Sequence, residues 1–181
     1  LPAVNLGTGR KAKAISAGDS HTCAVLDDNT VKCWGYGYSG QLGLGDTNTR
    51  GDNWNEMGDN LPVVNLGTGR KAKAISTGYY HTCAVLDDNT VKCWGYGYSG
   101  QLGLGDTNTR GDNWYEMGDN LPAVNLGTGR KVKAISAGGS HTCAILDDDS
   151  VKCWGYNYNG QLGLGDTNTR GDNWNEMGDN L

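Results

Sequence analysis

The stretch HTCAVLDDNTVKCWG, residues 21–35, decides the fold because it describes a complete β-hairpin with a cysteine in each strand. Both flanks are rich in strand-forming residues, and the Asp-Asp-Asn segment between them is turn chemistry. A three-residue hairpin loop combines a type I turn with one residue in the left-handed region, a conformation that Asn29 tolerates. This register places Cys23 directly opposite Cys33.

The opposed cysteines predict a disulfide in each hairpin. A non-hydrogen-bonded pair in an antiparallel ladder brings the two Cα atoms to about 4.5 Å, within reach of a disulfide. Free buried thiols and a zinc site are the alternatives, but zinc needs four ligands and only His21 accompanies the pair. We therefore expect no metal at the cysteines and an oxidising, extracellular or cell-surface location. The predicted bonds are Cys23–Cys33, Cys83–Cys93 and Cys143–Cys153.

The hairpin returns twice, because the chain consists of three copies of one 60-residue unit. Copies one and two differ at only five positions, which are 3, 17, 19, 20 and 55. We expect the copies to form three blades of one continuous array, with equivalent contacts between successive blades. The expected blades are residues 1–60, 61–120 and 121–181.

Each copy offers four short strands and no helical periodicity. Four strands joined by tight turns make an antiparallel meander that cannot bury both of its faces alone, so it must stack on neighbours. The sequence therefore predicts an all-β fold of tandem four-stranded antiparallel blades, of the β-propeller type. The strand candidates of copy one are Ala3–Leu6, Lys11–Ser16, His21–Leu26 and Val31–Trp34.

A long connection, residues 36–60, completes each copy. Connections of this length inside a compact repeat are functional or are packed by their own side chains. Gly40, Gly43 and Gly45 would allow close backbone approach between neighbouring blades. The apolar side chains expected to hold the loop down are Leu42, Trp54 and Met57.

Three short motifs in each copy carry a family resemblance. They are a Gly-x-x-His-Thr element, a Trp-Gly pair and a Gly-Gln-Leu-Gly-x-Gly-Asp run, and they recur at 78–106 and 138–166. The unit that contains them resembles the repeat of the regulator of chromosome condensation family, which implies a β-propeller of four-stranded blades. In copy one the matching residues are Gly18, His21, Thr22, Trp34, Gly35, Gly40, Gln41, Leu42, Gly43, Gly45 and Asp46.

Two features depart from that family. The Gly of its Asp-Gly turn is replaced by Asn29, Asn89 and Asp149, and family propellers close with about seven blades. Three blades cannot close a ring, so both end faces would be bare and suited to association. Identical chains would then complete a ring or extend into a filament. The nucleotide-exchange role of the founding member is not expected here, because its loops have no match in this chain.

The histidines suggest a structural role. His21, His81 and His141 occupy one repeated position, with no nucleophile or carboxylate partner placed uniquely beside any of them. We expect them to be hydrogen-bonded residues of the blade core, and we expect the protein not to be an enzyme. The motif tryptophans expected with them are Trp34, Trp94 and Trp154.

Copy two alone carries three additional tyrosines, at sites where the other copies have Asp, Gly, Ser or Asn. Exposed tyrosine is a frequent contact residue, so these side chains are a candidate binding patch for a protein or a glycan. Drift at permissive loop tips is the alternative explanation. The three residues are Tyr79, Tyr80 and Tyr115.

The loop run DTNTRGDN, residues 46–53, suggests two further sites. Its oxygen side chains near a Gly are typical of calcium loops, but the spacing does not fit an EF-hand, and self-capping turns are the simpler interpretation. We expect no cofactor and leave open a calcium site at Asp46, Asn48 and Asp52. The Arg-Gly-Asp tripeptide at residues 50–52 is interpreted as a polar turn rather than an adhesion motif.

Charge and hydropathy exclude other partners. The net charge of −5 disfavours nucleic acid, and no apolar run is long enough to span a membrane, so no membrane insertion is expected. The sequence therefore indicates a non-enzymatic extracellular structural repeat protein that self-associates through blade-to-blade contacts, as a filament or surface assembly. An oligomeric propeller that binds a protein or glycan is the alternative.

Overall fold

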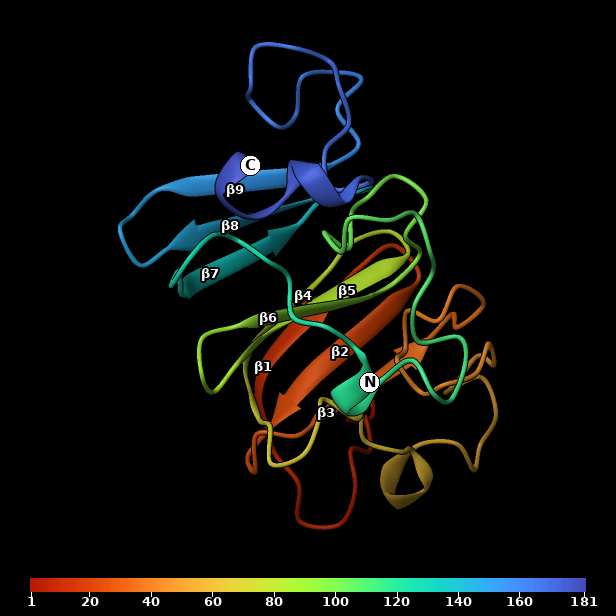
Figure 1. Cartoon of the computed structure of the whole chain (residues 1–181). Helices are drawn as coiled ribbons and strands as arrows, with labels where there is room; N and C mark the ends of the chain where they lie inside the picture. The colour runs from red at the N-terminus through yellow and green to blue at the C-terminus, as the bar shows by residue number, and fades with distance from the viewer.

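The computed structural model describes the whole chain, residues 1–181, and shows three antiparallel sheets that follow one another along the sequence (Figure 1). Each sheet has three strands in chain order. The all-β array of blades is thus confirmed. The strands are β1 (Ala12–Ala17), β2 (His21–Leu26), β3 (Val31–Gly35), β4 (Ala72–Thr77), β5 (His81–Leu86), β6 (Val91–Gly95), β7 (Val132–Ala137), β8 (His141–Leu146) and β9 (Val151–Gly155). Short 3₁₀ turns occupy Gly58–Asn60, Gly118–Asn120, Trp174–Glu176 and Gly178–Asn180.

The hairpin of each blade has the predicted register. Cys23 lies directly opposite Cys33 in the pairing of β2 with β3, and the two other blades repeat this pairing. Asn29 adopts a φ of 64°, and its equivalents Asn89 and Asp149 adopt 63° and 67°. These residues therefore supply the left-handed position that the three-residue loop requires.

The structure differs from the expected topology in one respect, because the predicted fourth strand of each blade is absent. Residues Ala3–Leu6 form no strand, and neither do their equivalents in the other copies. In copy two this segment lies along the outer strand of the preceding blade, where the Val64 N–H donates to the Val31 carbonyl at 2.8 Å. The segment forms no ladder, and its Pro62 has no N–H to donate to one. The lead-in segments, as we call them, are residues 1–6, 61–66 and 121–126.

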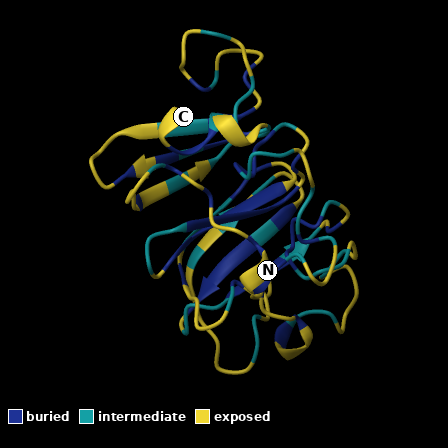
Figure 2. Ribbon diagram, viewed as in Figure 1, coloured by how far each residue is buried: buried dark blue, intermediate teal, exposed yellow.

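The hydrophobic core lies between successive sheets, in two interfaces that we call the first and second seams (Figure 2). Strand β4 packs against β1 and β2, and β7 packs against β4 and β5. Each seam combines the second and third strands of one blade with the lead-in segment and the strands of the next. The first seam buries Val25, Val31, Leu42, Val64, Leu66, Ala72 and Trp94, and the second buries Val85, Val91, Leu102, Val124, Leu126, Val132 and Trp154.

The long loop of one copy packs against the long loop of the next. Gly45 has a φ of +75°, its N–H donates to the Gly111 carbonyl at 3.1 Å, and a Cβ there would lie 2.6 Å from Trp114 Cα. The predicted close approach at this glycine is therefore present. Leu42 is buried as expected. Trp54 is 97% exposed, so the prediction that it holds the loop down is wrong.

Candidate functional site at the seam between repeats

A chain of buried hydrogen bonds crosses the first seam. Nε2 of His21 lies 2.8 Å from Thr82 Oγ1, and the Thr82 hydroxyl donates to the Gln41 carbonyl oxygen at 2.9 Å. The indole N–H of Trp94 donates to the same carbonyl at 3.0 Å. Four groups from two repeats are thus satisfied together inside the core. The second seam repeats the arrangement with His81, Thr142, Gln101 and Trp154.

The directions of these hydrogen bonds determine the tautomer of His21. Because the Thr82 hydroxyl hydrogen points to Gln41, His21 must donate from Nε2, which leaves Nδ1 without a hydrogen or a partner. Burial lowers the pKa of His21 to about 4. Burial, with His21 and His141 nearby, lowers the pKa of His81 to about 3. Both side chains are neutral at pH 7 and serve as structural donors.

The structure brings each seam histidine together with the motif tryptophan of the following copy. His21 of copy one shares a hydrogen-bond chain with Trp94 of copy two, and His81 shares one with Trp154. Trp34 and His141 remain at the two ends of the array without a partner repeat. Within the array, each seam histidine therefore shares its hydrogen-bond chain with the tryptophan of the following repeat.

The three predicted disulfides are present, each with a Cα–Cα distance of 4.1 Å. The first two are fully buried in the seams, and Cys23 Sγ lies 3.9 Å from the Thr82 hydroxyl of the next repeat. The third, in the last blade, is half-buried because it lies outside both seams. Besides closing their hairpins, the first two disulfides form part of the surface that receives the next blade.

A buried lysine in each of the first two copies was missed by the sequence reasoning. Lys92 Nζ donates to the Leu66 carbonyl at 3.0 Å and to the Gly118 carbonyl at 2.7 Å, and the side chain is only 8% exposed. Lys32 makes the equivalent two bonds in copy one. Burial lowers the pKa of both lysines. The sequence did contain a signal for this lysine, because it lies between two strand residues that face the core.

The last blade exposes one half of a seam. Ile145 and Val151 are 42% and 61% exposed, whereas their equivalents Val85 and Val91 are 2% and 0% exposed inside the second seam. An apolar hollow of about 100 Å³ lies beside them, lined in part by Cys143. Gly160, Gly163 and Gly165 of this copy also have no neighbour within 4 Å, in contrast to Gly45. The C-terminal face, as we call it, comprises His141, Cys143, Ile145, Val151, Cys153 and Gln161.

The first blade exposes the other half. Val4 is 56% exposed, whereas its equivalents Val64 and Val124 are 5% and 7% exposed. Trp34 is half-buried, although Trp94 and Trp154 have no exposed surface. Figure 2 shows β5 and β6 of the interior sheet as buried and both end blades with exposed strand segments. The N-terminal face comprises Leu1, Val4, Ala12, Thr22 and Trp34.

The three tyrosines of copy two do not form one patch. The ring centroid of Tyr80 lies 6.2 Å from that of Tyr36 and 6.5 Å from that of Tyr96. Tyr79 lies over Gly139 of the next copy. Tyr115 packs edge-on against Trp114 and lines a polar hollow of about 600 Å³ in the long loop.

The loop run at residues 46–53 is held by its own contacts. One Asp46 carboxylate oxygen accepts from the Asn48 N–H at 2.9 Å, and the other pairs with Arg50 at 2.6 Å. The backbone of Arg50 bridges to Gly35 at the end of β3. No group of three or more His, Cys, Asp or Glu side chains converges in a way that could hold a metal ion. The run is thus a self-capped turn anchored to the blade.

None of the helical segments has the length and apolar character needed to cross a membrane. The longest extended elements are strands of six residues.

Comparison with known proteins gives matches that recur along the repeats of the chain. The family model for the regulator of chromosome condensation (RCC1) repeat matches residues 28–85 and 88–145, and a second model of this repeat matches 12–41, 72–101 and 132–161. The ultraviolet-B receptor UVR8 of Arabidopsis thaliana is 34% identical over 161 residues, 87% of this chain and 32% of that protein. The X-linked retinitis pigmentosa GTPase regulator of Canis lupus familiaris is 32% identical over 151 residues, 83% of this chain and 14% of that protein.

The fold has solved counterparts. Yeast RCC1 (Prp20), crystallised bound to Kap60, superposes with a TM-score of 0.66 at 19% identity, over 88% of this chain and 36% of that chain. The chain spans about a third or less of the proteins it matches. With the family match extending over more than half of its residues, this chain belongs to the regulator of chromosome condensation (RCC1) repeat family, as a β-propeller-type repeat module.

Proposed function

We propose that this chain is a non-enzymatic, extracellular repeat module that associates end to end, the C-terminal face of one copy receiving the N-terminal face of a second copy. The observation that supports this proposal is the match between the two end faces. Each is one half of a seam that occurs twice inside the chain with nearly the same residues.

The polar groups of the two faces are complementary. At the C-terminal face, His141 and Gln161 lack the threonine and tryptophan that their equivalents contact inside the chain. At the N-terminal face, Thr22 and Trp34 lack the glutamine carbonyl. Docking a second copy would rebuild the histidine–threonine–glutamine chain of the internal seams.

The apolar side chains of the two end faces also support the docking of a second copy. Val151 and Ile145 are the residues that would cover Val4 and Ala12 of a second copy, as Val91 and Val85 cover Val124 and Val132. Burial of apolar surface is the main driving force for such association. A face docking on a different face is a heterologous contact, which closes into a ring or continues as a filament.

The extracellular location is supported by the disulfides. Every cysteine is paired and no thiol is free. Cross-links of this kind persist in oxidising compartments and are rare in the cytosol. The named relatives are receptors and regulators, which accords with a module that acts by contact and not by catalysis.

The test uses two face variants. Val151→Asp places a charge on the C-terminal face, and Val4→Asp places one on the N-terminal face. We expect the unmodified chain to form assemblies whose mass rises with concentration, and each variant alone to remain monomeric. An equimolar mixture should yield one-to-one dimers, because only one pair of intact faces remains. Light scattering after size exclusion and negative-stain microscopy measure these masses.

A matched control is Val63→Asp. Val63 is 49% exposed even with both neighbouring blades present, so it lies outside the seam contacts. This variant should assemble like the unmodified chain. A chain that stays monomeric at all concentrations, or face variants that assemble as well as the control, would overturn the proposal.

A further inference from the structure

Five tyrosines form a continuous line across the first two blades. The order is Tyr38, Tyr36, Tyr80, Tyr96 and Tyr98, and we call it the tyrosine row. Successive ring centroids are 5.9, 6.2, 6.5 and 6.0 Å apart, which are contact distances for aromatic rings. The row is thus a single aromatic surface.

The backbone holds the row in place. The N–H of Tyr36 donates to the Ser20 carbonyl, and the N–H of Tyr96 donates to the Tyr80 carbonyl, both at 2.8 Å. These bonds fasten the residue after the last strand of a blade to the tip that precedes its middle strand. Tyr36 and Tyr96 are therefore anchored to the end of a disulfide-closed hairpin.

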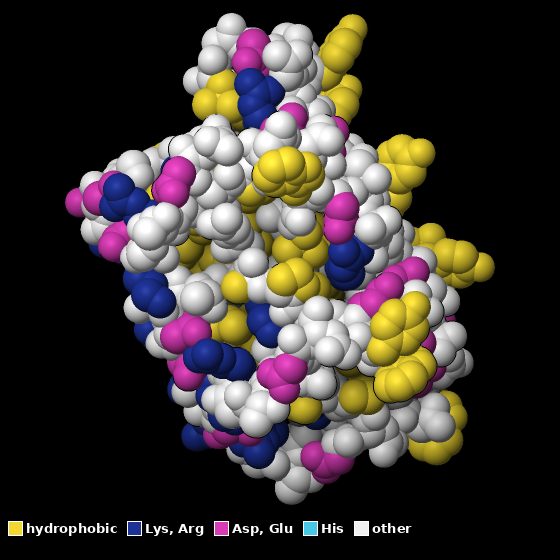
Figure 3. Space-filling model, in the orientation of Figure 1, with side chains coloured by type: hydrophobic (Ala, Val, Ile, Leu, Met, Phe, Trp, Pro, Cys, Tyr) yellow, Lys and Arg dark blue, Asp and Glu magenta, His cyan; other side chains and the backbone are white.

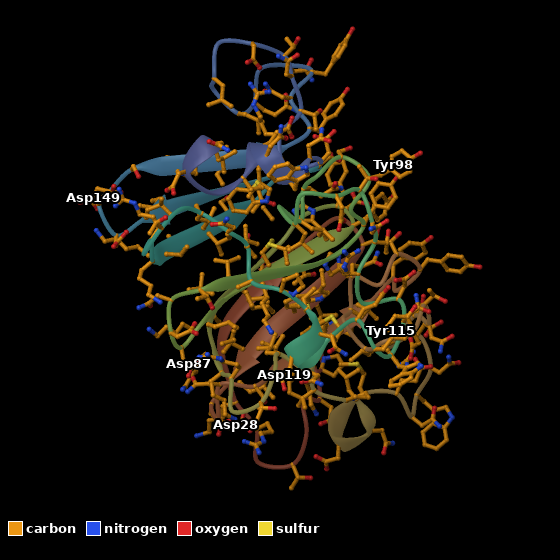
Figure 4. The ribbon with its side chains drawn as sticks, in the orientation of Figure 1. Asp28, Asp87, Tyr98, Tyr115, Asp119 and Asp149 are labelled. Carbon is orange, nitrogen blue, oxygen red and sulfur yellow. A yellow bond between two sulfur atoms is a disulfide. The ribbon has the colours of Figure 1, made fainter.

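The row is accessible. The outer members Tyr38 and Tyr98 are 71% and 72% exposed, and the three inner members are 36–40% exposed. Figure 4 shows Tyr98 projecting from the edge of the molecule, and Figure 3 shows large hydrophobic-class side chains protruding along this edge. A ligand could therefore contact the rings along the whole row.

One residue connects the two halves of the row. Tyr80 bridges Tyr36 of blade one and Tyr96 of blade two, whereas copies one and three have serine at this position. In copy three Tyr156 and Tyr158 stack at 6.3 Å, but Ser140 stands where a tyrosine would link them to the row. The unbroken row depends on Tyr80.

We infer that the tyrosine row binds a neutral, extended oligosaccharide laid across blades one and two. The side chains that flank the row along the chain are Gly, Ser, Tyr and a neutral buried histidine, so the tyrosines and their chain neighbours carry no formal charge. A pyranose ring offers an apolar C–H face and a rim of hydroxyl groups. Tyrosine offers a ring face and a phenol hydroxyl, which complement both features.

The geometry of the row disfavours a proline-rich peptide. A polyproline II segment docks into grooves between aromatic ridges. Adjacent rings in this row contact one another, which leaves a ridge without a groove between its members. An extended sugar chain can lie along such a ridge. This inference is independent of the end-to-end association.

The test exchanges residues between the copies, so every variant carries a residue that this fold already accepts at that position. Tyr80→Ser interrupts the row, and Ser140→Tyr extends it to Tyr156 and Tyr158. Isothermal titration with cellohexaose and chitohexaose, and with the matching disaccharides, measures binding. We expect one hexasaccharide to bind, with Tyr80→Ser weakening it about tenfold and Ser140→Tyr strengthening it. Disaccharide binding should change little in either variant.

Tyr79→Gly is the matched control, because Tyr79 is an exposed neighbour outside the row and copy three has Gly139 at this position. It should leave hexasaccharide binding unchanged. The inference is wrong if the unmodified chain binds neither hexasaccharide, if Tyr80→Ser binds as well as the unmodified chain, or if a proline-rich peptide binds to the row in preference to the sugars.

Discussion

Nε2 of His21 donates to Thr82 Oγ1 across 2.8 Å, although 61 residues of sequence separate the two residues. This bond joins the start of one blade's central strand to that of the next and leads on to the Gln41 carbonyl. It recurs between His81 and Thr142. Because these groups are buried, the seam is specified by polar contacts as well as by apolar packing.

Removing the threonine hydroxyl should destabilise the fold. Thr82→Val keeps the shape but leaves the His21 N–H and one lone pair of the Gln41 carbonyl unsatisfied in the core. We expect a loss of about 2 kcal/mol in the free energy of unfolding, measured by urea denaturation. Thr22→Val is the control, since Thr22 lies at the open N-terminal face, and it should cost much less. Equal losses in the two variants would contradict the seam network.

Acid should destabilise the protein in the range where buried histidines are forced to ionise. The pKa of His21 falls to about 4 and that of His81 to about 3 on folding. The unfolded chain therefore binds more protons below about pH 6.5, so stability is fully present above this pH and is lost as the pH falls. Thermal unfolding between pH 8 and pH 4 should show a declining midpoint.

His81→Gln tests the origin of that decline. Glutamine can donate to Thr142 but does not ionise. We expect this variant to have a shallower pH dependence than the unmodified protein, whatever its stability at neutral pH. An unchanged slope would assign the acid sensitivity to other groups.

The third disulfide should be reduced before the other two. Cys143–Cys153 is half-buried at the C-terminal face, whereas Cys23–Cys33 and Cys83–Cys93 are fully buried. A reductant reaches an exposed sulfur more readily. Partial reduction, alkylation and peptide mass spectrometry at low protein concentration should find Cys143 and Cys153 labelled first. Uniform labelling of all six cysteines would contradict this order.

The buried lysine should contribute to stability. Lys92→Met removes the donor to the Leu66 and Gly118 carbonyls, both of which lose a charge-assisted hydrogen bond. We expect a loss of about 2 kcal/mol in the free energy of unfolding. Lys73→Met is the matched control, because the exposed Lys73 makes a single solvent-exposed hydrogen bond, to the Asn89 side chain, and it should be nearly neutral. Denaturant titration of both variants measures the difference.

Much of each blade could be predicted from the sequence. The Asp-Asp-Asn turn sets the hairpin register, the register opposes Cys23 and Cys33, and the left-handed position of Asn29 follows from the loop length. These relationships span ten residues or fewer and depend on local backbone geometry. The near-exact repetition of the unit also predicts that the blade recurs three times.

The contacts between blades were decided by the tertiary structure. The lead-in segment was expected as a fourth strand, but it serves the preceding blade with one hydrogen bond per seam. The partner of His21, the two carbonyls that hold Lys92 and the Tyr36 ring that Tyr80 contacts all lie 26 residues or more away in the sequence. Short-range turn chemistry determined what each blade is. How the blades face one another, and hence which groups meet in a seam, depends on how whole sheets stack to bury their apolar faces.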